Sequence, residues 1–250
     1  MLQLRQEQLD AFESIEATFF PARMQAHLVE YFPRHAALLG ESGCRDVIRN
    51  GIDSARSHGF TRQAPAALLI DLSLLLGRGF DNDVQLPWAA HILADTGYTE
   101  DIPRAQRLHA VAMDYLDLVS GPDNEYIDNA QRRLLYEHPD LFTGSAEAFS
   151  EEVLFRLERI WPEKHARVGS AQMGLLITQG VARARAYGIL SEPGWLVYVI
   201  MMYMLGSGFD RDPMFAWAQP VLQGCRGRNQ AESTRLLHAA GLGYLKNWCV

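Results

Sequence analysis

The sequence predicts an all-α protein built from two similar helical-bundle halves, and three observations support this fold class. Apolar residues recur at intervals of three and four, the spacing that places them on one face of a helix. No segment shows the sustained two-residue alternation, bounded by hairpin turns, that is typical of strands. The same residue pattern occurs twice, at one constant offset along the chain. With 250 residues, 48% of them hydrophobic, the chain can bury one large core or two modest ones.

The internal repeat is the strongest pattern in the sequence. LGRGFDND at 76–83 returns as LGSGFDRD at 205–212, and NGIDSARSHGF at 50–60 returns as QGVARARAYGI at 179–189. We call the shift from position 76 to position 205 the repeat offset. We expect two repeat units, at about 25–116 and 155–245, within an N-terminal half of residues 1–120 and a C-terminal half of residues 121–250. Other matches at the repeat offset are Pro33 and Pro162, Gly40 and Gly169, Trp88 and Trp217, Leu93 and Leu222, and Tyr115 and Tyr244.

Such a repeat predicts how the halves are arranged. An internal duplication would give two halves of the same fold, and two halves built alike are expected to pack about a pseudo-twofold axis as one globular body.

Start and stop residues place the individual helices. Apolar spacing within 46–58 predicts a helix that Gly59 ends, and 172–187 repeat this pattern up to Gly188. Two stretches follow, AALLIDLSLLLG at 66–77 and WLVYVIMMYMLG at 195–206. Each is almost wholly apolar and is therefore expected at the centre of the bundle. Further helices are expected at 4–17, 22–32, 105–119, 124–136, 146–160 and 230–248, with short helices around Trp88 and Trp217.

The repeated loop contains paired glycines and aspartates, a composition also found in calcium and phosphate sites. An EF-hand calcium loop needs a glycine at its sixth position and a glutamate at its twelfth, and counting from Asp81 or Asp210 gives neither. A dinucleotide-binding loop needs a third glycine and a preceding strand, whereas a buried helix is predicted before each copy. The loop is therefore predicted to be a structural corner.

In this corner, the first glycine is expected to end a helix in the left-handed conformation and the second to allow a tight reversal. The phenylalanine is expected to tuck under the turn, and the aspartates to bond backbone N–H groups or to cap the next short helix. The loop residues are Gly77, Gly79, Phe80, Asp81 and Asp83 in the first copy, and Gly206, Gly208, Phe209, Asp210 and Asp212 in the second.

The remaining polar residues form no catalytic or metal-binding pattern. None of the eight histidines stands at a metal-ligand spacing, and neither a P-loop nor a nucleophilic serine motif occurs. His109 and His238 match across the repeat and are expected to be packed and hydrogen-bonded. Asp71 interrupts an apolar helix where the second copy has Ile200. We expect it either to have a specific partner, an arginine or a backbone cap, or to face a gap. No catalytic residue, metal or cofactor is predicted.

Charge and cysteine content restrict the partners. The formal charge is −7, and residues 1–125 carry 10 Arg and no Lys against 18 acids, whereas residues 126–250 are nearly balanced. An acidic half repels nucleic acid and attracts basic partners, so direct DNA or RNA binding is not expected. Three widely spaced cysteines indicate neither disulfides nor zinc. No signal peptide or membrane-spanning run is predicted, so we expect a cytoplasmic protein that does not bind membranes.

The densest acidic segment is the candidate partner-binding site. Residues 95–128 hold eight acids and, among arginines and lysines, only Arg104 and Arg107. Asp114 and Asp117 are three apart on a predicted helix and so share one face, and the turn at Gly121 can present the acids that follow. A solvated face without a partner is the alternative. The eight acids are Asp95, Glu100, Asp101, Asp114, Asp117, Asp123, Glu125 and Asp128.

Several segments resemble a group of helical proteins encoded beside bacterial type VI secretion toxins. They are LRQEQLDAF at 4–12, RMQAHLVEYFP at 23–33, GIDSARSHGF at 51–60, LGRGFD at 76–81 and LPWAAHIL at 86–93. The group includes immunity proteins, which protect the producing cell by binding the cognate toxin. The sequence is most similar to the partner of a toxin with a restriction-endonuclease-like nuclease domain. The first loop departs from the D-R-D-P form of the second, which indicates different surfaces on the two halves.

The resemblance implies an immunity protein that binds and neutralises a toxin, and an acidic surface suits the basic substrate groove of a nuclease. Two other interpretations stay open. An adaptor or chaperone that loads a secreted toxin onto the type VI apparatus would bind a non-toxic domain of its partner. An enzyme of unrecognised type would have a deep pocket with convergent polar groups and a perturbed titratable residue.

Overall fold

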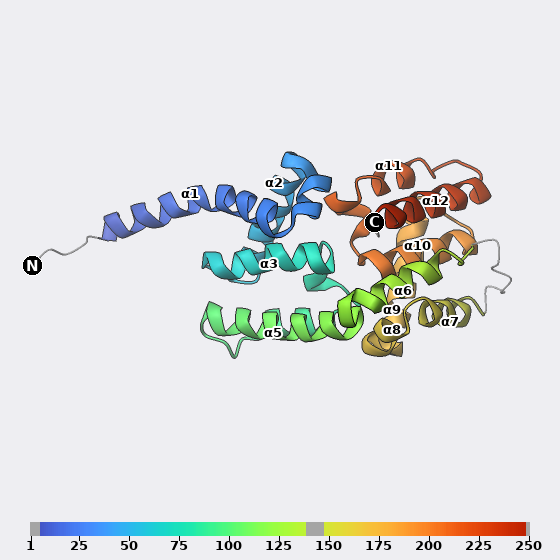
Figure 1. Cartoon of the computed structure of the whole chain (residues 1–250), viewed down its shortest axis with the longest axis horizontal. Coiled ribbons are helices and arrows are strands. Elements are labelled where there is room, and N and C mark those ends of the chain that lie inside the picture. The colour runs from blue at the N-terminus through green and yellow to red at the C-terminus, as the bar shows by residue number, and fades with distance from the viewer. Residues whose placement is uncertain (1–5, 139–147, 249–250) are drawn as a thin grey trace, which may run out of the picture.

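The computed structural model describes residues 6–138 and 148–248, and within these ranges the regular structure is entirely helical (Figure 1). The predicted all-α fold class is confirmed. The α-helices are α1 (Gln6–Tyr31), α2 (Pro33–Ser57), α3 (Gln63–Leu76), α4 (Pro87–Leu93), α5 (Asp101–Ser120), α6 (Glu125–Leu134), α7 (Phe149–Ile160), α8 (Pro162–Val168), α9 (Ser170–Ala186), α10 (Glu192–Leu205), α11 (Ala218–Gln223) and α12 (Gln230–Trp248). Single-turn 3-10 helices are η1 (Phe80–Asn82), η2 (Pro122–Asn124), η5 (Phe209–Arg211) and η6 (Pro213–Phe215).

The helices form two groups that share a core. Figure 1 shows α1, α2, α3 and α5 in one group and α7 to α12 in the other, with the beginning of α1 projecting away from the rest. Helix α6 lies among the second group and packs against α7, although it follows α5 almost directly in the chain. The groups are joined where α5 packs on α8 and where α2 packs on η6. One continuous cluster of buried apolar side chains runs through both groups.

The two apolar helices differ in how deeply they are buried. In α10 every residue from 196 to 203 is buried, because α7, α9 and α12 pack around it. Helix α3 packs mainly on α2 and α5, and its other side is less covered, since Leu75 is exposed and Asp71 is half-buried. The expectation of a central helix is therefore right for α10 and wrong in part for α3. Burying a large apolar side chain stabilises a fold by about 1.5–3 kcal/mol, so α10 is a major source of stability.

Many element boundaries are related by the repeat offset. Helix α3 (63–76) matches α10 (192–205) at both ends, and η1 (80–82) matches η5 (209–211) in the same way. Helix α1 ends at Tyr31 and α7 at Ile160, and α5 begins at Asp101 and α12 at Gln230. Gly40, which has positive φ, kinks α2, and Gly169 separates α8 from α9.

Three elements differ from the sequence-based expectation. Helix α2 begins at Pro33, whereas the expected helix covered 46–58. Helix α1 runs through Pro21 as a single helix where two were expected. A proline removes one backbone hydrogen bond, and in a helix of 26 residues the bonds on both sides of it remain. Helix α8, of seven residues, was not expected from the sequence.

Candidate functional site

The two repeated loops contact each other, and their aspartates exchange hydrogen bonds. Asp83 Oδ2 accepts a hydrogen bond from the backbone N–H of Ser207 at 2.7 Å, and Asp212 Oδ2 accepts one from the backbone N–H of Arg78 at 2.8 Å. Each aspartate also accepts a bond at 2.9 Å from the backbone N–H two residues further along its own loop. Bonds to backbone N–H groups were expected within each loop. The structure adds bonds that cross from one half to the other, so this contact is a joint between the halves.

Glycine is required in the joint because the two backbones approach closely. A Cβ on Gly77 would lie 2.9 Å from the carbonyl oxygen of Leu205, and one on Gly206 would lie 3.1 Å from that of Leu76. Both glycines have positive φ, 90° and 94°, but ψ is 158° and 152°, so they are not in the left-handed helical conformation that was expected. Extended ψ with positive φ is open almost only to glycine.

The second glycines of the two loops differ. Gly79 is left-handed, with φ 78° and ψ 21°, whereas Gly208 has φ −93° and ψ 7°. A Cβ on Gly208 would lie only 2.2 Å from the carbonyl oxygen of Arg78. Gly208 is therefore constrained by the opposite loop rather than by its own φ. The two loops share one conformation at the first glycine and not at the second.

The other residues of each loop make contacts within their own half of the chain. Phe80 and Phe209 are buried. Asp81 accepts a hydrogen bond from Ser54 Oγ at 2.7 Å and, through its contact with His58 Nε2 at 2.9 Å, ties the corner to the end of α2. Burial raises the pKa of Asp81, but the hydrogen bonds from His58 and Ser54 outweigh it and leave the pKa below its ordinary value. In the second half, Asp210 accepts a hydrogen bond from the hydroxyl of Tyr187 at 3.0 Å.

Five of the eight acids proposed for partner binding form what we call the acidic surface. They are exposed, and none forms an ion pair with another described residue. Two lie on the second half of α5, one lies in η2, and two lie in the first turn of α6. The acidic surface consists of Asp114, Asp117, Asp123, Glu125 and Asp128.

The turn that presents the acidic surface has an unusual backbone. Asp123 and Asn124 are the two non-glycine residues with positive φ in the described chain, at 51° and 65°. Gly121 also has positive φ, and a Cβ there would lie 2.6 Å from the ring of Tyr126. Asp and Asn adopt this left-handed conformation more readily than other non-glycine residues, and they do so in tight turns. The turn places Asp123 at the surface between α5 and α6.

The other three acids are placed differently. Asp101 accepts hydrogen bonds from the backbone N–H groups of Thr61 (2.7 Å) and Arg62 (3.0 Å) and from the Thr61 hydroxyl, and so fastens the start of α5 to the start of α3. Burial raises the pKa of Asp101, but these hydrogen bonds outweigh it and leave the pKa below its ordinary value. Asp95, which accepts a bond from the N–H of Gly97, and Glu100 are also exposed and form no ion pair in the described structure. Both precede α5, whereas Asp114 and Asp117 lie on its second half, so we leave them out of the acidic surface.

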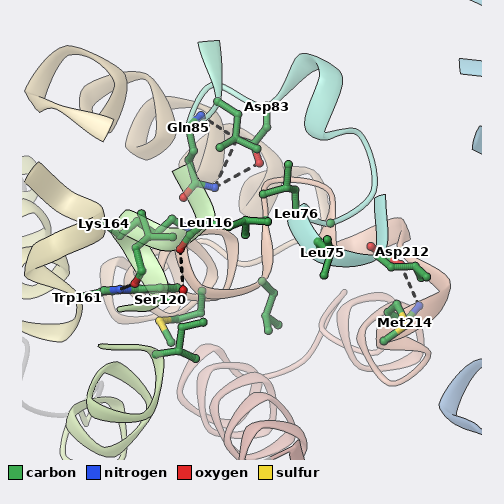
Figure 2. Close-up of a pocket in the computed structure, with 18 of the residues that line it drawn as sticks. Leu75, Leu76, Asp83, Gln85, Leu116, Ser120, Trp161, Lys164, Asp212 and Met214 are labelled. Atoms are coloured by element: carbon green, nitrogen blue, oxygen red, sulfur yellow. Dashed lines mark hydrogen bonds between the residues drawn. The ribbon is translucent and has the colours of Figure 1, made fainter. Parts of the chain in front are cut away.

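A cavity of about 410 Å³, here called the central cavity, lies between the two halves (Figure 2). Several lining positions are related by the repeat offset, among them His35 and Lys164, Asp83 and Asp212, and Tyr115 and Tyr244. Figure 2 shows Gln85, Lys164 and Trp161 along one side of the drawn residues, and Asp212 and Met214 along the other. Ligand sites commonly have volumes of roughly 300–1,000 Å³, so the central cavity is large enough to hold a small molecule.

Sequence reasoning missed Lys164, the most unusual residue of the central cavity. Its side chain is buried, and burial lowers its pKa to about 8, with the charge of Asp83 acting in the opposite direction. Its Nζ donates a hydrogen bond to the carbonyl oxygen of Tyr203 at 2.5 Å, and it lies 4.9 Å from the ring centre of Trp161. The sequence offered one weak sign, since the chain contains two lysines and only this one falls within the repeat at a position equivalent to a histidine, His35.

The structure also shows the surroundings of Asp71, His109 and His238, whose roles the sequence did not determine. Asp71 pairs with His27, whose Nε2 lies 3.0 Å from both carboxylate oxygens, so the expected arginine or backbone partner was wrong. Burial raises the pKa of Asp71, and His27 opposes this shift. His238 is half-buried and its Nε2 contacts the carbonyl of Glu137, whereas His109 is exposed, contrary to expectation.

Comparison with known proteins gave no match to a family model, a curated protein or a solved structure. Within the described residues, no three or more His, Cys, Asp or Glu side chains come together as a metal site. No described helix combines the length and the apolar content needed to cross a bilayer.

Proposed function

We propose that this chain is an immunity protein that binds and neutralises a cognate type VI secretion toxin, a nuclease, in the cytoplasm. The observation that carries the proposal is the acidic surface. Its five carboxylates are exposed and lack ion-pair partners among the described residues, and a tight turn presents one of them at the surface. A nuclease must present basic groups to its substrate, and unpaired carboxylates can occupy such a groove. The resemblance of the sequence to proteins encoded beside such toxins points in the same direction.

We further infer that the two halves arose by internal duplication and are related by a pseudo-twofold axis. The reciprocal bonds of Asp83 and Asp212 across the joint support this inference, since a twofold axis would exchange them. Equivalent contacts also recur inside each half. The backbone N–H of Thr61 bonds to Asp101, and at the positions equivalent by the repeat offset the N–H of Leu190 bonds to Gln230. These contacts would stabilise the scaffold. A toxin inhibitor needs such a stable scaffold and does not need an active site.

Co-expression with the adjacent toxin gene tests the proposal. The wild-type chain should restore growth, and the triple variant D114A/D117A/E125A should protect less. In binding kinetics this variant should associate at least about threefold more slowly at low salt, and with a weaker salt dependence, because rim charges act mainly on the encounter rate. Exposed charges contribute little to stability, so the variant should melt at nearly the wild-type temperature.

A matched control removes the same charge elsewhere. Glu41 and Asp53 are exposed and Asp46 is partly exposed on α2, where each pairs with an arginine one helical turn away. The triple variant E41A/D46A/D53A should protect as well as the wild type. Equal loss of protection in both variants would show that net charge rather than the acidic surface is responsible. Continued cell death with the wild-type chain, together with lost toxin delivery on deletion, would favour the adaptor instead.

A second candidate, an enzyme of unrecognised type, is favoured by the central cavity with its buried lysine of lowered pKa. Against it, Lys164 is hydrogen-bonded to a main-chain carbonyl, and in the described structure it makes no hydrogen bond to a carboxylate or an imidazole. The variant K164M separates the two candidates. A folded K164M chain that still protects supports neutralisation through the acidic surface, and loss of protection without loss of toxin binding supports an enzyme.

A further inference from the structure

The central cavity holds a buried cation whose hydrogen-bonding capacity is largely unused. An ammonium group has three N–H donors, and in the described structure Lys164 uses one, on the carbonyl of Tyr203. The rings of Trp161 and Tyr203 lie 4.9 Å and 5.0 Å from Nζ, and no carboxylate of the described residues forms an ion pair with it. The charge of Asp83 acts on Lys164 from a distance, but the ammonium group forms no direct ion pair in the described structure. A buried charge without a direct ion-pair partner is costly, so a bound anion would stabilise this site.

The same cavity holds a buried acceptor without a donor. Gln85 is 2% exposed, and its Nε2 is fully engaged with Asp83, the carbonyl of Met202 and the hydroxyl of Ser207. Its Oε1 is buried and has no hydrogen-bond partner in the part of the chain that the structure describes. An unsatisfied buried acceptor costs about 1–3 kcal/mol, so such groups are rare in native structures and need an explanation. A ligand with an O–H or N–H group would supply the missing donor.

The remaining walls are mostly aliphatic and reach the surface. Leucine side chains of α3, α5, α10 and α12 line the cavity, with Val119, Ile127 and Met204. Leu75 and Asn124 also line it and are exposed, so the cavity has a mouth beside the turn of the acidic surface. A ligand must therefore combine a hydrocarbon part with a small polar head.

The charges around the cavity limit that head to a single negative charge. Asp83 and Asp212 line it and are already bonded to backbone N–H groups of the joint. Their charges would repel a phosphate dianion more strongly than a carboxylate, and Lys164 is the one lysine that lines the described cavity to compensate. The hydroxyls of Tyr115 and Tyr244 stay protonated at neutral pH, since burial raises the pKa of both.

We propose that the central cavity binds a medium-chain aliphatic carboxylate that carries a hydroxyl group near its carboxylate. Lys164 donates to the carboxylate, Gln85 Oε1 accepts from the hydroxyl, and the leucines surround the hydrocarbon chain. This site does not depend on the proposed toxin-binding function, because none of the five residues of the acidic surface lines the cavity.

Calorimetry on the full chain tests the assignment, with probes below their micelle-forming concentrations. 3-Hydroxydecanoate should bind saturably, decanoate more weakly, and decanol and decylamine much more weakly still. Loss of a charge-assisted hydrogen bond weakens binding by about tenfold or more, which is the effect expected for K164M. K246M, which removes the exposed lysine of α12, should bind as the wild type does. No saturable heat with either acid, equal binding of decanol, or unchanged binding in K164M would overturn the proposal.

Two further measurements do not depend on the folding of K164M. The chain has only two lysines, so with isotope-labelled lysine their side-chain resonances can be followed individually in the wild-type protein, with both ammonium groups unaltered. The acid should shift the Lys164 resonance and leave that of Lys246 unchanged; the reverse would contradict the site. L116F narrows the cavity while keeping Lys164, so it should weaken decanoate binding more than butyrate binding. Equal effects on both acids would place the hydrocarbon chain elsewhere.

Discussion

The joint between the loops makes a quantitative prediction for the variant G77A. Gly77 and Gly169 both end helices and have nearly the same backbone conformation, with φ 90° and 83° and ψ 158° at each. Alanine in this conformation costs about 1–3 kcal/mol of backbone strain and recovers about 0.4–1 kcal/mol because the unfolded chain becomes less flexible. These two contributions should be alike in G77A and G169A.

The two positions differ only in what surrounds them. A Cβ on Gly77 would lie 2.9 Å from the carbonyl oxygen of Leu205, whereas a Cβ on Gly169 would meet nothing within 4 Å. Because the obstacle is backbone of the opposite half, relief requires the joint to open, and overpacking of this kind costs about 1–3 kcal/mol. G77A should therefore lose about 1–3 kcal/mol more free energy of unfolding than G169A. G206A, with its contact at 3.1 Å, should fall between them.

Urea unfolding followed by circular dichroism measures the three differences. The dependence of the unfolding free energy on urea should stay the same in all variants, so that the shift of the midpoint reports stability alone. Equal losses in G77A and G169A would refute the reasoning, because they would mean that strain accounts for the whole effect and that the two loops do not press on each other in solution.

Three other results are expected. The folded-state pKa of Asp81 is lowered, so its contribution to stability is present above the unfolded pKa and disappears as the pH falls through the folded one. The stability gap between the wild type and D81N should therefore shrink between about pH 5 and pH 2, and a constant gap would contradict this. E137A should lower the free energy of unfolding in urea by about 3 kcal/mol, because Arg156, which is buried and lies 2.8 Å from Glu137, loses an ion-pair partner. A loss below about 1 kcal/mol would show that Glu152 alone is enough to balance the charge of Arg156. Calcium should give no saturable heat and no change in melting temperature, and binding tighter than about 10 μM would overturn the structural role of the loops.

The sequence predicted those parts of the fold that depend on neighbouring residues. Helix α12 begins and ends where expected, and the helices before Gly59 and Gly188 end there, because helix caps and apolar spacing act within a few residues. The repeat also located both corners. Their conformation at Gly77 was not predicted, since it depends on the backbone of the opposite loop.

The acidic segment at 95–128 also shows that contacts with distant residues could not be predicted from the sequence. Its charge was visible in the sequence, and Asp114 and Asp117 lie exposed on one helix as expected from their spacing. The sequence could not separate Asp101 from them. Its three hydrogen bonds come from residues 39 and 40 positions earlier, a pairing that exists only once α3 and α5 pack together.

By itself, the sequence determined the all-helical class, the approximate positions of most helices and the correspondence of positions at the repeat offset, because local periodicity and capping residues encode them. Only the tertiary structure decided that α10 and not α3 is fully enclosed, that His27 is the partner of Asp71, and that Lys164 lies buried in a cavity between the halves. Burial and pairing of this kind depend on which distant segments meet. Such contacts leave no periodic trace along the chain, so a lysine in the sequence reads as a surface residue until the fold surrounds it.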